Sequence, residues 1–452
     1  MSVSAVLALA MPLVLNSGVQ AVLGLTDAWF VGRLSTEATA ALGAVYYLVF
    51  VFILLFGGVG MCVQPLVAQA YGARRRHRAA RAVWTGLWGA LLTAPFFAAL
   101  ALIGAWLLRP FELAPQIEAL ALAYWFPRML GGPVAVAVWV VTSFFNGVGR
   151  TRITLLIVVV ESVVNAILNQ LFMFNLGWGI AGSAWATTAA MLVGLALGAA
   201  IFLRREFRRD FKSQLLWRPR ARPIRRLLAF GLPMGLSGTV DLFGLSLFQL
   251  MQVKLGAVEG AASQIAMMLT SLAFLPAIGL GLAGTTLVGQ SIGAGDKDWA
   301  RRLGNTTILL CVLYMGAVGV LLAATSPWLL PLFVAAGDPN AAQVIALGGL
   351  LLWLAACYQL FDGMNLGSTF CLRGAGDVRV PAAMVLVLAW FVWVPLAHML
   401  TFAPGQGWVG FLPQFGYGAA GGWVAAIVYV SALGVTLLLR WRSGAWRRIK
   451  IG

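Results

Sequence analysis

Five ionisable side chains stand inside otherwise apolar stretches of this 452-residue chain, and their chemistry calls for an explanation. They are Asp27, Arg128, Glu161, Asp241 and Asp362. A charge at the depth of a lipid bilayer costs about 3 kcal/mol or more, so an ionisable group at that depth is a functional candidate. The alternative for any one of them is a buried polar group that holds helices together.

The first group of candidates surrounds Asp27. Asp27, Asn169 and Thr187 each lie near the outer end of an apolar stretch, and therefore at a similar depth. Glu161, Asn165 and Asn169 are spaced i, i+4, i+8, which places them on one face of a helix. Apolar surroundings disfavour a charged carboxylate, while amide and hydroxyl groups can hydrogen-bond either of its forms. The pattern favours proton uptake at Asp27, and contacts between helices of about 0.6 kcal/mol each are the alternative.

The second group consists of Asp241 and Asp362, which both fall near the middle of their apolar stretches. Asp241 has Gln20 as its counterpart 221 residues earlier, so the two halves differ in charge. The five intramembrane groups sum to −3, which predicts attraction of cations. Asp241 and Asp362 are therefore the candidates for a second cation or substrate site. Arg128 lies at a different depth from both groups, and the sequence predicts no role for it.

The composition places these residues in a membrane. The chain is 61% hydrophobic and 10% charged, with a mean hydropathy of +0.91. It therefore has too few polar residues to cover the surface of a soluble globular protein. The first apolar stretch lacks the pattern of a cleavable leader and is expected to be a retained transmembrane helix. Four cysteines lie in or beside apolar stretches without metal-ligand spacing, so we expect neither a metal site nor a disulfide framework: Cys62, Cys311, Cys357 and Cys371.

A repeat divides the chain into two halves. Pro12 precedes Gln69 by 57 residues, and Pro233 precedes Gln290 by the same interval, an offset of 221 between copies. Repeated halves of this length are typical of transporters. Apolar stretches of about 20 residues or more occur at 5–31, 38–70, 82–108, 117–146, 153–174, 183–203, 227–255, 261–290, 303–332, 341–372, 380–402 and 420–440.

These twelve stretches predict an all-α integral membrane protein with two six-helix lobes related by a pseudo-two-fold axis along the membrane normal. The expected division is 1–203 for the first lobe, 204–226 for a basic linker and 227–452 for the second lobe. If the N-terminus is cytoplasmic, the inner loops and tail carry +22 and the outer loops −2. Positive charge concentrates on the cytoplasmic side of membrane proteins, so both termini are predicted inside. The same distribution accounts for the net charge of +17 without a nucleic-acid partner.

Several motifs in register resemble the multidrug and toxic compound extrusion (MATE) transporters, and within them the NorM-like branch. The motifs are the early Pro12, DAWFVGRLSTEATAALGA, the pair LVAQAYGA and LVGQSIGA, NGVGRTR, VVNAILNQLFMF with GIAGSAWAT downstream, and QLFDGMNLGSTFCLRGAGD. The similarity covers essentially the whole chain. It implies two six-helix lobes around a V-shaped cleft. It also implies export of cationic or amphipathic drugs by alternating access, in exchange for entering protons or sodium ions.

The resemblance also suggests roles for individual residues. It places Asp27 on the family's carboxylate of the first helix, and Asn165, Asn169 and Thr187 on the polar residues around it. Asp241 falls where NorM-like members carry Glu, and Asp362 falls on an Asp of the family. Glu161 and Gln20 are accessory candidates.

The coupling ion is expected to be a proton. A sodium-binding subgroup carries Tyr three residues before a proline where this chain has Ala273, and this departure favours protons over sodium. Sodium at Asp241 and Asp362 is the alternative. No organic cofactor is expected, and the expected partners are small drugs and membrane lipids. The chain is expected to act as a monomer in a bacterial inner membrane.

Two other functions compete with drug export. A lipid-linked oligosaccharide flippase of the same superfamily handles anionic substrates and would need a cationic cavity, which the −3 balance disfavours. An intramembrane enzyme would need a nucleophile with a base, or a metal cluster. His77 lies in a basic loop and His398 stands alone in an apolar stretch, so no catalytic site is expected.

Overall fold

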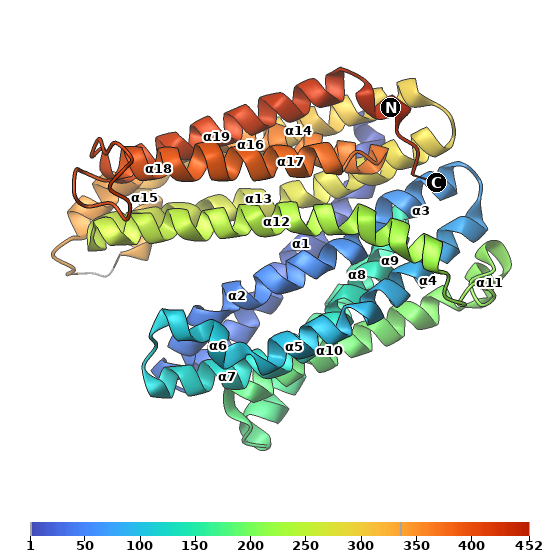
Figure 1. Cartoon of the computed structure of the whole chain (residues 1–452), viewed down its shortest axis with the longest axis horizontal. Coiled ribbons are helices and arrows are strands. Elements are labelled where there is room, and N and C mark those ends of the chain that lie inside the picture. The colour runs from blue at the N-terminus through green and yellow to red at the C-terminus, as the bar shows by residue number, and fades with distance from the viewer. Residues whose placement is uncertain (1, 335–336, 452) are drawn as a thin grey trace. The chain divides into compact units, whose positions relative to one another are not determined.

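The computed structural model describes residues 2–334 and 337–451, and these residues form helices with no strand (Figure 1). The helices up to the linker are α1 (Ser2–Gly32), α2 (Thr36–Met61), α3 (Val63–Gly72), α4 (Arg76–Leu92), α5 (Ala94–Leu102), α6 (Gly104–Leu108), η1 (Arg109–Phe111), α7 (Pro115–Leu130), α8 (Gly132–Gly147), α9 (Thr151–Asn169), η2 (Gln170–Asn175), α10 (Gly179–Phe202) and α11 (Arg205–Phe211). The remaining helices are α12 (Ala221–Leu255), α13 (Ala257–Gly293), α14 (Lys297–Ala324), α15 (Ser326–Leu329), η3 (Leu330–Phe333), α16 (Ala341–Ala375), α17 (Arg379–Leu388), η4 (Ala389–Trp393), α18 (Val394–Thr401), α19 (Gly418–Arg442) and η5 (Ala445–Arg448).

Eleven helical segments of the described chain are long and apolar enough to cross a membrane, and a bent pair makes a twelfth. The pair is α7 and α8, which meet at an angle of 45° around Gly131. Pro133 lies at the start of α8, where its missing N–H group ends the hydrogen-bond ladder of the preceding helix. The all-helical fold and the twelve spans expected from hydropathy are thus confirmed.

The chain divides into two compact units, which are described separately. One contains the chain up to Ala10, Val240–Val288 and Asp298–Lys450, and the other contains Met11–Thr239 and Gly289–Lys297. The helices α1, α12, α13 and α14 contribute residues to both units.

In the unit that contains Met11–Thr239, α9 lies along α10, and α2 packs on α7 and α8. The linker is anchored to this unit. Phe207 and Phe211 are buried against Phe144 of α8, and the indole of Trp84 donates a hydrogen bond of 2.6 Å to the carbonyl of Ser213. The linker therefore exposes its arginines while its aromatic side chains hold it to the helices.

The repeated motifs meet in the same unit. A Cβ on Gly72, at the end of α3, would lie 1.9 Å from the Gln290 carbonyl, and a Cβ on Gly293, at the end of α13, would lie 2.0 Å from the Gln69 carbonyl. The two backbones are therefore in contact at positions that only glycine can occupy. Gln290 also donates a hydrogen bond of 2.8 Å to the carbonyl of Gly147, within the NGVGRTR motif. The backbone contact is reciprocal, which explains why Gly recurs at this position in both copies.

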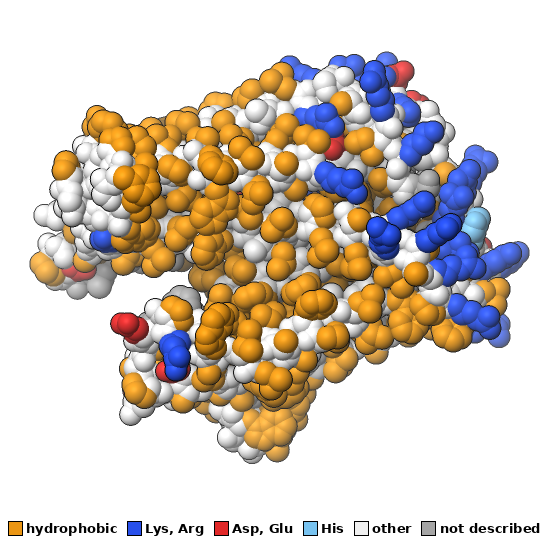
Figure 2. All heavy atoms as spheres, viewed as in Figure 1, with side chains coloured by type: hydrophobic (Ala, Val, Ile, Leu, Met, Phe, Trp, Pro, Cys, Tyr) orange, Lys and Arg blue, Asp and Glu red, His pale blue; other side chains and the backbone are white. Residues whose placement is uncertain are grey.

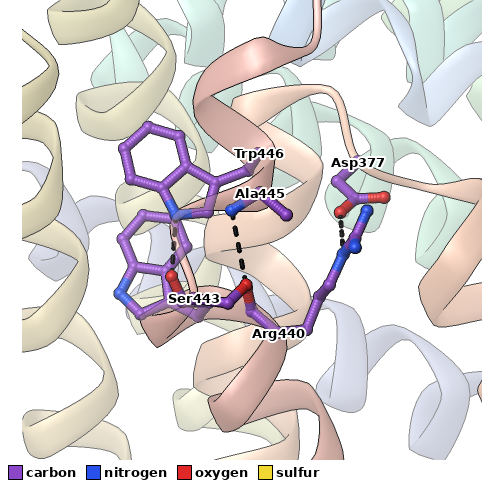
Figure 3. A network of polar contacts seen from close by, with 6 residues as sticks. Asp377, Arg440, Ser443, Ala445 and Trp446 are labelled. Atoms are coloured by element: carbon purple, nitrogen blue, oxygen red, sulfur yellow. Dashed lines mark hydrogen bonds and ion pairs between the residues drawn. The ribbon is translucent and has the colours of Figure 1, made fainter.

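In the other unit, α16 lies along α19, and an ion pair joins the loop after α16 to the end of α19 (Figure 3). Arg440 Nε lies 2.7 Å from Oδ2 of Asp377, whose side chain is 3% exposed. Next to it, the Trp446 indole donates a hydrogen bond of 2.8 Å to the Trp441 carbonyl, and the two rings stack. These contacts hold the ends of α16 and α19 together.

Candidate functional site

Asp27 lies in a closed ring of four hydrogen-bonded side chains contributed by α1, α9 and α10. Asn169 donates to Oδ1 of Asp27 at 2.7 Å and to Oδ1 of Asn165 at 3.1 Å. Asn165 donates to the hydroxyl of Thr187 at 3.2 Å, and that hydroxyl lies 3.1 Å from Oδ2 of Asp27. The four residues expected to form the first site are therefore brought together by the fold.

The local structure explains this ring. Asn165 and Asn169 are one turn apart on the same face of α9, so that Asn165 meets Thr187 of α10 and Asn169 meets Asp27 of α1. All four side chains are buried, with Asn165 and Asn169 fully inaccessible and Asp27 6% exposed. In such surroundings each hydrogen bond is stronger than in water, and an unpaired polar group is costly.

The ring has one acceptor to spare. Both N–H groups of the Asn169 amide are engaged, whereas its Oδ1 is buried without a hydrogen-bond partner in the described structure. A protonated Asp27 would have one more donor, and a rotated Asn169 amide would offer it this oxygen. The ring can therefore accommodate Asp27 in its charged and in its neutral form.

Arg128 is the cation associated with this site. It stands one turn before Gly131 of the α7–α8 bend, where Gly131 lies against Thr188 of α10. Its guanidinium interacts electrostatically with Asp27, and its Nε and Nη1 atoms are buried without a hydrogen-bond partner in the described part of the chain. Sequence depth alone did not associate Arg128 with Asp27.

The two accessory candidates lie outside the ring. Glu161 is buried one turn before Asn165 on the same face of α9. Gln20 is exposed, two turns before Asp27 on α1. Of the two, only Glu161 shares the buried face that carries the ring.

The second pair of acids lies in the other unit. Tyr429 of α19 donates a hydrogen bond to Oδ1 of Asp241, and its ring stacks on Trp393 at a centroid distance of 4.7 Å. Asn365 donates to Oδ1 of Asp362 at 3.0 Å. The two carboxyl groups interact electrostatically with each other, so α12, α16 and α19 bring both acids to one region.

Sequence reasoning missed three residues at this second site: Tyr429, Trp393 and Asn365. Asn365 follows Asp362 by three positions on one helix, a spacing that could have identified it. Tyr429 and Trp393 are single aromatic residues in apolar helices, where no pattern separates them from core residues. In the described chain no three His, Cys, Asp or Glu side chains are grouped so as to hold a metal ion.

Comparison with known proteins gives consistent matches. Residues 12–171 and 233–399 match the family model MatE. The chain is 31% identical to a probable multidrug resistance protein NorM from Mesorhizobium japonicum, over 97% of this chain and 93% of that protein. It is 32% identical to a probable multidrug resistance protein NorM from Pseudomonas aeruginosa, over 97% and 89% of the two chains.

Solved structures share the fold. A MATE crystal structure in complex with MaL6 superposes with a TM-score of 0.85 at 19% identity, over 99% of this chain and 98% of that chain. An outward-facing multidrug resistance MATE family transporter of the MOP superfamily gives the same TM-score at 19% identity, over 99% and 97%.

Proposed function

The chain belongs to the MatE family of membrane transporters, and we propose that it exports cationic or amphipathic drugs in exchange for entering protons. Relatives named as multidrug resistance proteins at about 30% identity support drug export. The observation that carries the proton coupling is the ring around Asp27, with its spare acceptor on Asn169.

The ring suits a proton better than a sodium ion. Both oxygens of Asp27 face hydrogen-bond donors, the amide of Asn169 and the hydroxyl of Thr187. A bound sodium ion needs several oxygen lone pairs directed at it, and the N–H group that Asn169 directs at Asp27 would repel it. A proton needs only one carboxylate oxygen and an acceptor for the new O–H group. Sodium at Asp241 and Asp362 is the alternative.

The proposed cycle is one of competition between the two ligands. With the site open to the outside, Asp27 takes up a proton, the Asn169 amide rotates to accept the new O–H group, and bound drug leaves. With the site open to the cytoplasm, Asp27 releases the proton and drug binds. Antiport requires only that the proton and the drug favour opposite conformations by about 1–3 kcal/mol.

The second pair of acids is proposed to attract the cationic drug. Asp241 and Asp362 supply two negative charges in an apolar helix bundle, and the ring of Tyr429, which contacts Asp241, stacks on Trp393. Aromatic faces attract organic cations, and carboxylates add charge pairing. We further propose that the transporter works as a monomer in the inner membrane of a bacterium, with both termini in the cytoplasm.

Purified protein in proteoliposomes tests this function directly. Drug efflux is followed first under an imposed pH gradient alone and then under a sodium gradient alone. Efflux is expected under the pH gradient and not under the sodium gradient. Efflux under sodium alone would overturn the proton coupling, and movement of a lipid-linked oligosaccharide without drug efflux would indicate a flippase.

A further inference from the structure

Glu161 is a buried acid that the proposed cycle does not use. It stands near the middle of α9, 6% exposed, and its Oε1 is buried without a hydrogen-bond partner among the described residues. None of the ion pairs among the described residues includes Glu161. An ionised carboxylate is costly in such surroundings unless it is paired, so a Glu is an unusual residue at this position.

Glu161 continues the interface that carries the Asp27 ring. On α9 it precedes Asn165 by one turn and Asn169 by two, a distance of about 12 Å along the helix. On α10 it faces Gly194, where a Cβ would lie 2.0 Å from Oε1 of Glu161. Gly194 follows Thr187 by seven residues, two turns along the same face of α10. The same two helix faces therefore hold the ring at one end and Glu161 at the other.

The polar face of α9 extends further toward the basic end of this helix. Thr154 lies seven residues before Glu161, is 1% exposed, and donates a hydrogen bond of 2.7 Å to Asn146 of α8. Arg150 and Arg152 lie at the start of α9, which is the end expected on the cytoplasmic side. Glu161 thus lies between the Asp27 ring and the end of α9 that should face the cytoplasm.

We propose that Glu161 is a second proton-binding site, which receives the proton from Asp27 and passes it toward the cytoplasm. When the site is open to the cytoplasm, a proton released by Asp27 leaves a carboxylate there. Entering water carries the proton along this face of α9, and it binds a carboxylate oxygen of Glu161. Glu161 then releases it to water on the cytoplasmic side and is charged again. This step rests on the proposed proton coupling and adds an exit route to it.

A neutral replacement of the same shape separates this role from packing. Wild type, Glu161→Gln and Glu161→Asp are compared in proteoliposomes by two measurements: drug efflux driven by a pH gradient, and exchange of labelled for unlabelled drug without a gradient. Glu161→Gln is expected to slow the pH-driven efflux at least about tenfold. A positioned proton-transfer group accelerates a reaction roughly a hundredfold, and the variant should lose part of that acceleration. Drug exchange should remain, and Glu161→Asp should recover part of the pH-driven rate.

Glu37→Gln is the matched control, because Glu37 is an exposed acid in the first turn of α2. It should leave both measurements unchanged. Gly194→Ala is a second probe, because the added methyl group displaces the Glu161 carboxyl without removing it. It should also slow pH-driven efflux while drug exchange remains, and it keeps the test available if Glu161→Gln fails to fold.

The outcomes separate the two proposals. If wild type responds to the pH gradient and Glu161→Gln behaves like wild type, the second proton site is wrong and the proposed function stands. If Glu161→Gln loses both efflux and exchange, Glu161 has a packing role. If wild type itself ignores the pH gradient, the proposed proton coupling fails, and the exit route fails with it.

Discussion

At the scale of single residues, the Asp27 site is controlled by the balance of donors and acceptors around one carboxylate. Asn169 and Thr187 direct donors at Asp27, and the unpaired oxygen of Asn169 is available when Asp27 gains a proton. An amide at position 27 could form part of the ring but could not bind and release a proton.

Asp27→Asn is therefore expected to abolish pH-driven drug efflux, with a loss of at least about 100-fold in initial rate, while the protein is still produced and inserted. Efflux from proteoliposomes and the amount of protein in membranes are the measurements. Asp210→Asn, at an exposed acid paired with Arg76, is the control and should be neutral. Wild-type efflux by Asp27→Asn would refute the assignment of the first site.

The two acids of the second site give a separate prediction. Asp241→Asn combined with Asp362→Asn removes both charges and should abolish binding of a cationic drug. Tyr429→Phe removes only the hydrogen bond to Asp241 and should weaken drug binding roughly tenfold, the effect of about 1.5 kcal/mol. Equilibrium binding of a labelled drug measures both effects, with Tyr417→Phe at an exposed tyrosine as the control. Unchanged binding and efflux in the double variant would show that these acids are structural.

At the scale of helices, the close approach of α3 and α13 depends on two glycines. The Cβ positions of Gly72 and Gly293 are occupied by the backbone carbonyls of Gln290 and Gln69. Backbone atoms cannot move aside as a flexible side chain can, so a methyl group at either position must push the helices apart.

Gly72→Ala and Gly293→Ala should each lower stability by about 1–3 kcal/mol, the usual cost of overpacking. The melting temperature of the detergent-solubilised protein measures this effect. Gly43→Ala is a control in α2, where a Cβ would meet nothing within 4 Å, and it should not lower the melting temperature. A melting temperature of wild-type value in both alanine variants would contradict the close contact.

At the scale of the whole molecule, the charge distribution sets the orientation in the membrane. Figure 2 shows Lys and Arg side chains gathered around α11 and the turn before α4, where the chain carries Arg74, Arg75, Arg76 and Arg78. Loops rich in Lys and Arg stay in the cytoplasm, whereas the loop between α18 and α19 has no charged residue.

Cysteines introduced one at a time by Arg209→Cys or Phe411→Cys test this orientation. The background carries Cys357→Ala, because Cys357 is exposed and the other three cysteines are buried. Both positions are exposed. A membrane-impermeant maleimide applied to intact cells should label Phe411→Cys and not Arg209→Cys, and should label both after permeabilisation. The reverse pattern would place the termini outside.

The sequence by itself determined the membrane class, the twelve apolar spans and the shared face of Asn165 and Asn169, because hydropathy and helical periodicity are local properties. Motif similarity along the whole chain indicated the family. Only the tertiary structure decided which side chains meet: Asp27 and Asn169 are 142 residues apart, and Asp241 and Tyr429 are 188 apart. Periodicity shows which face of a helix is polar, but the partner across the interface depends on how far each helix is shifted and bent. For the same reason, the contact between Glu161 and Gly194 could not be found without the fold.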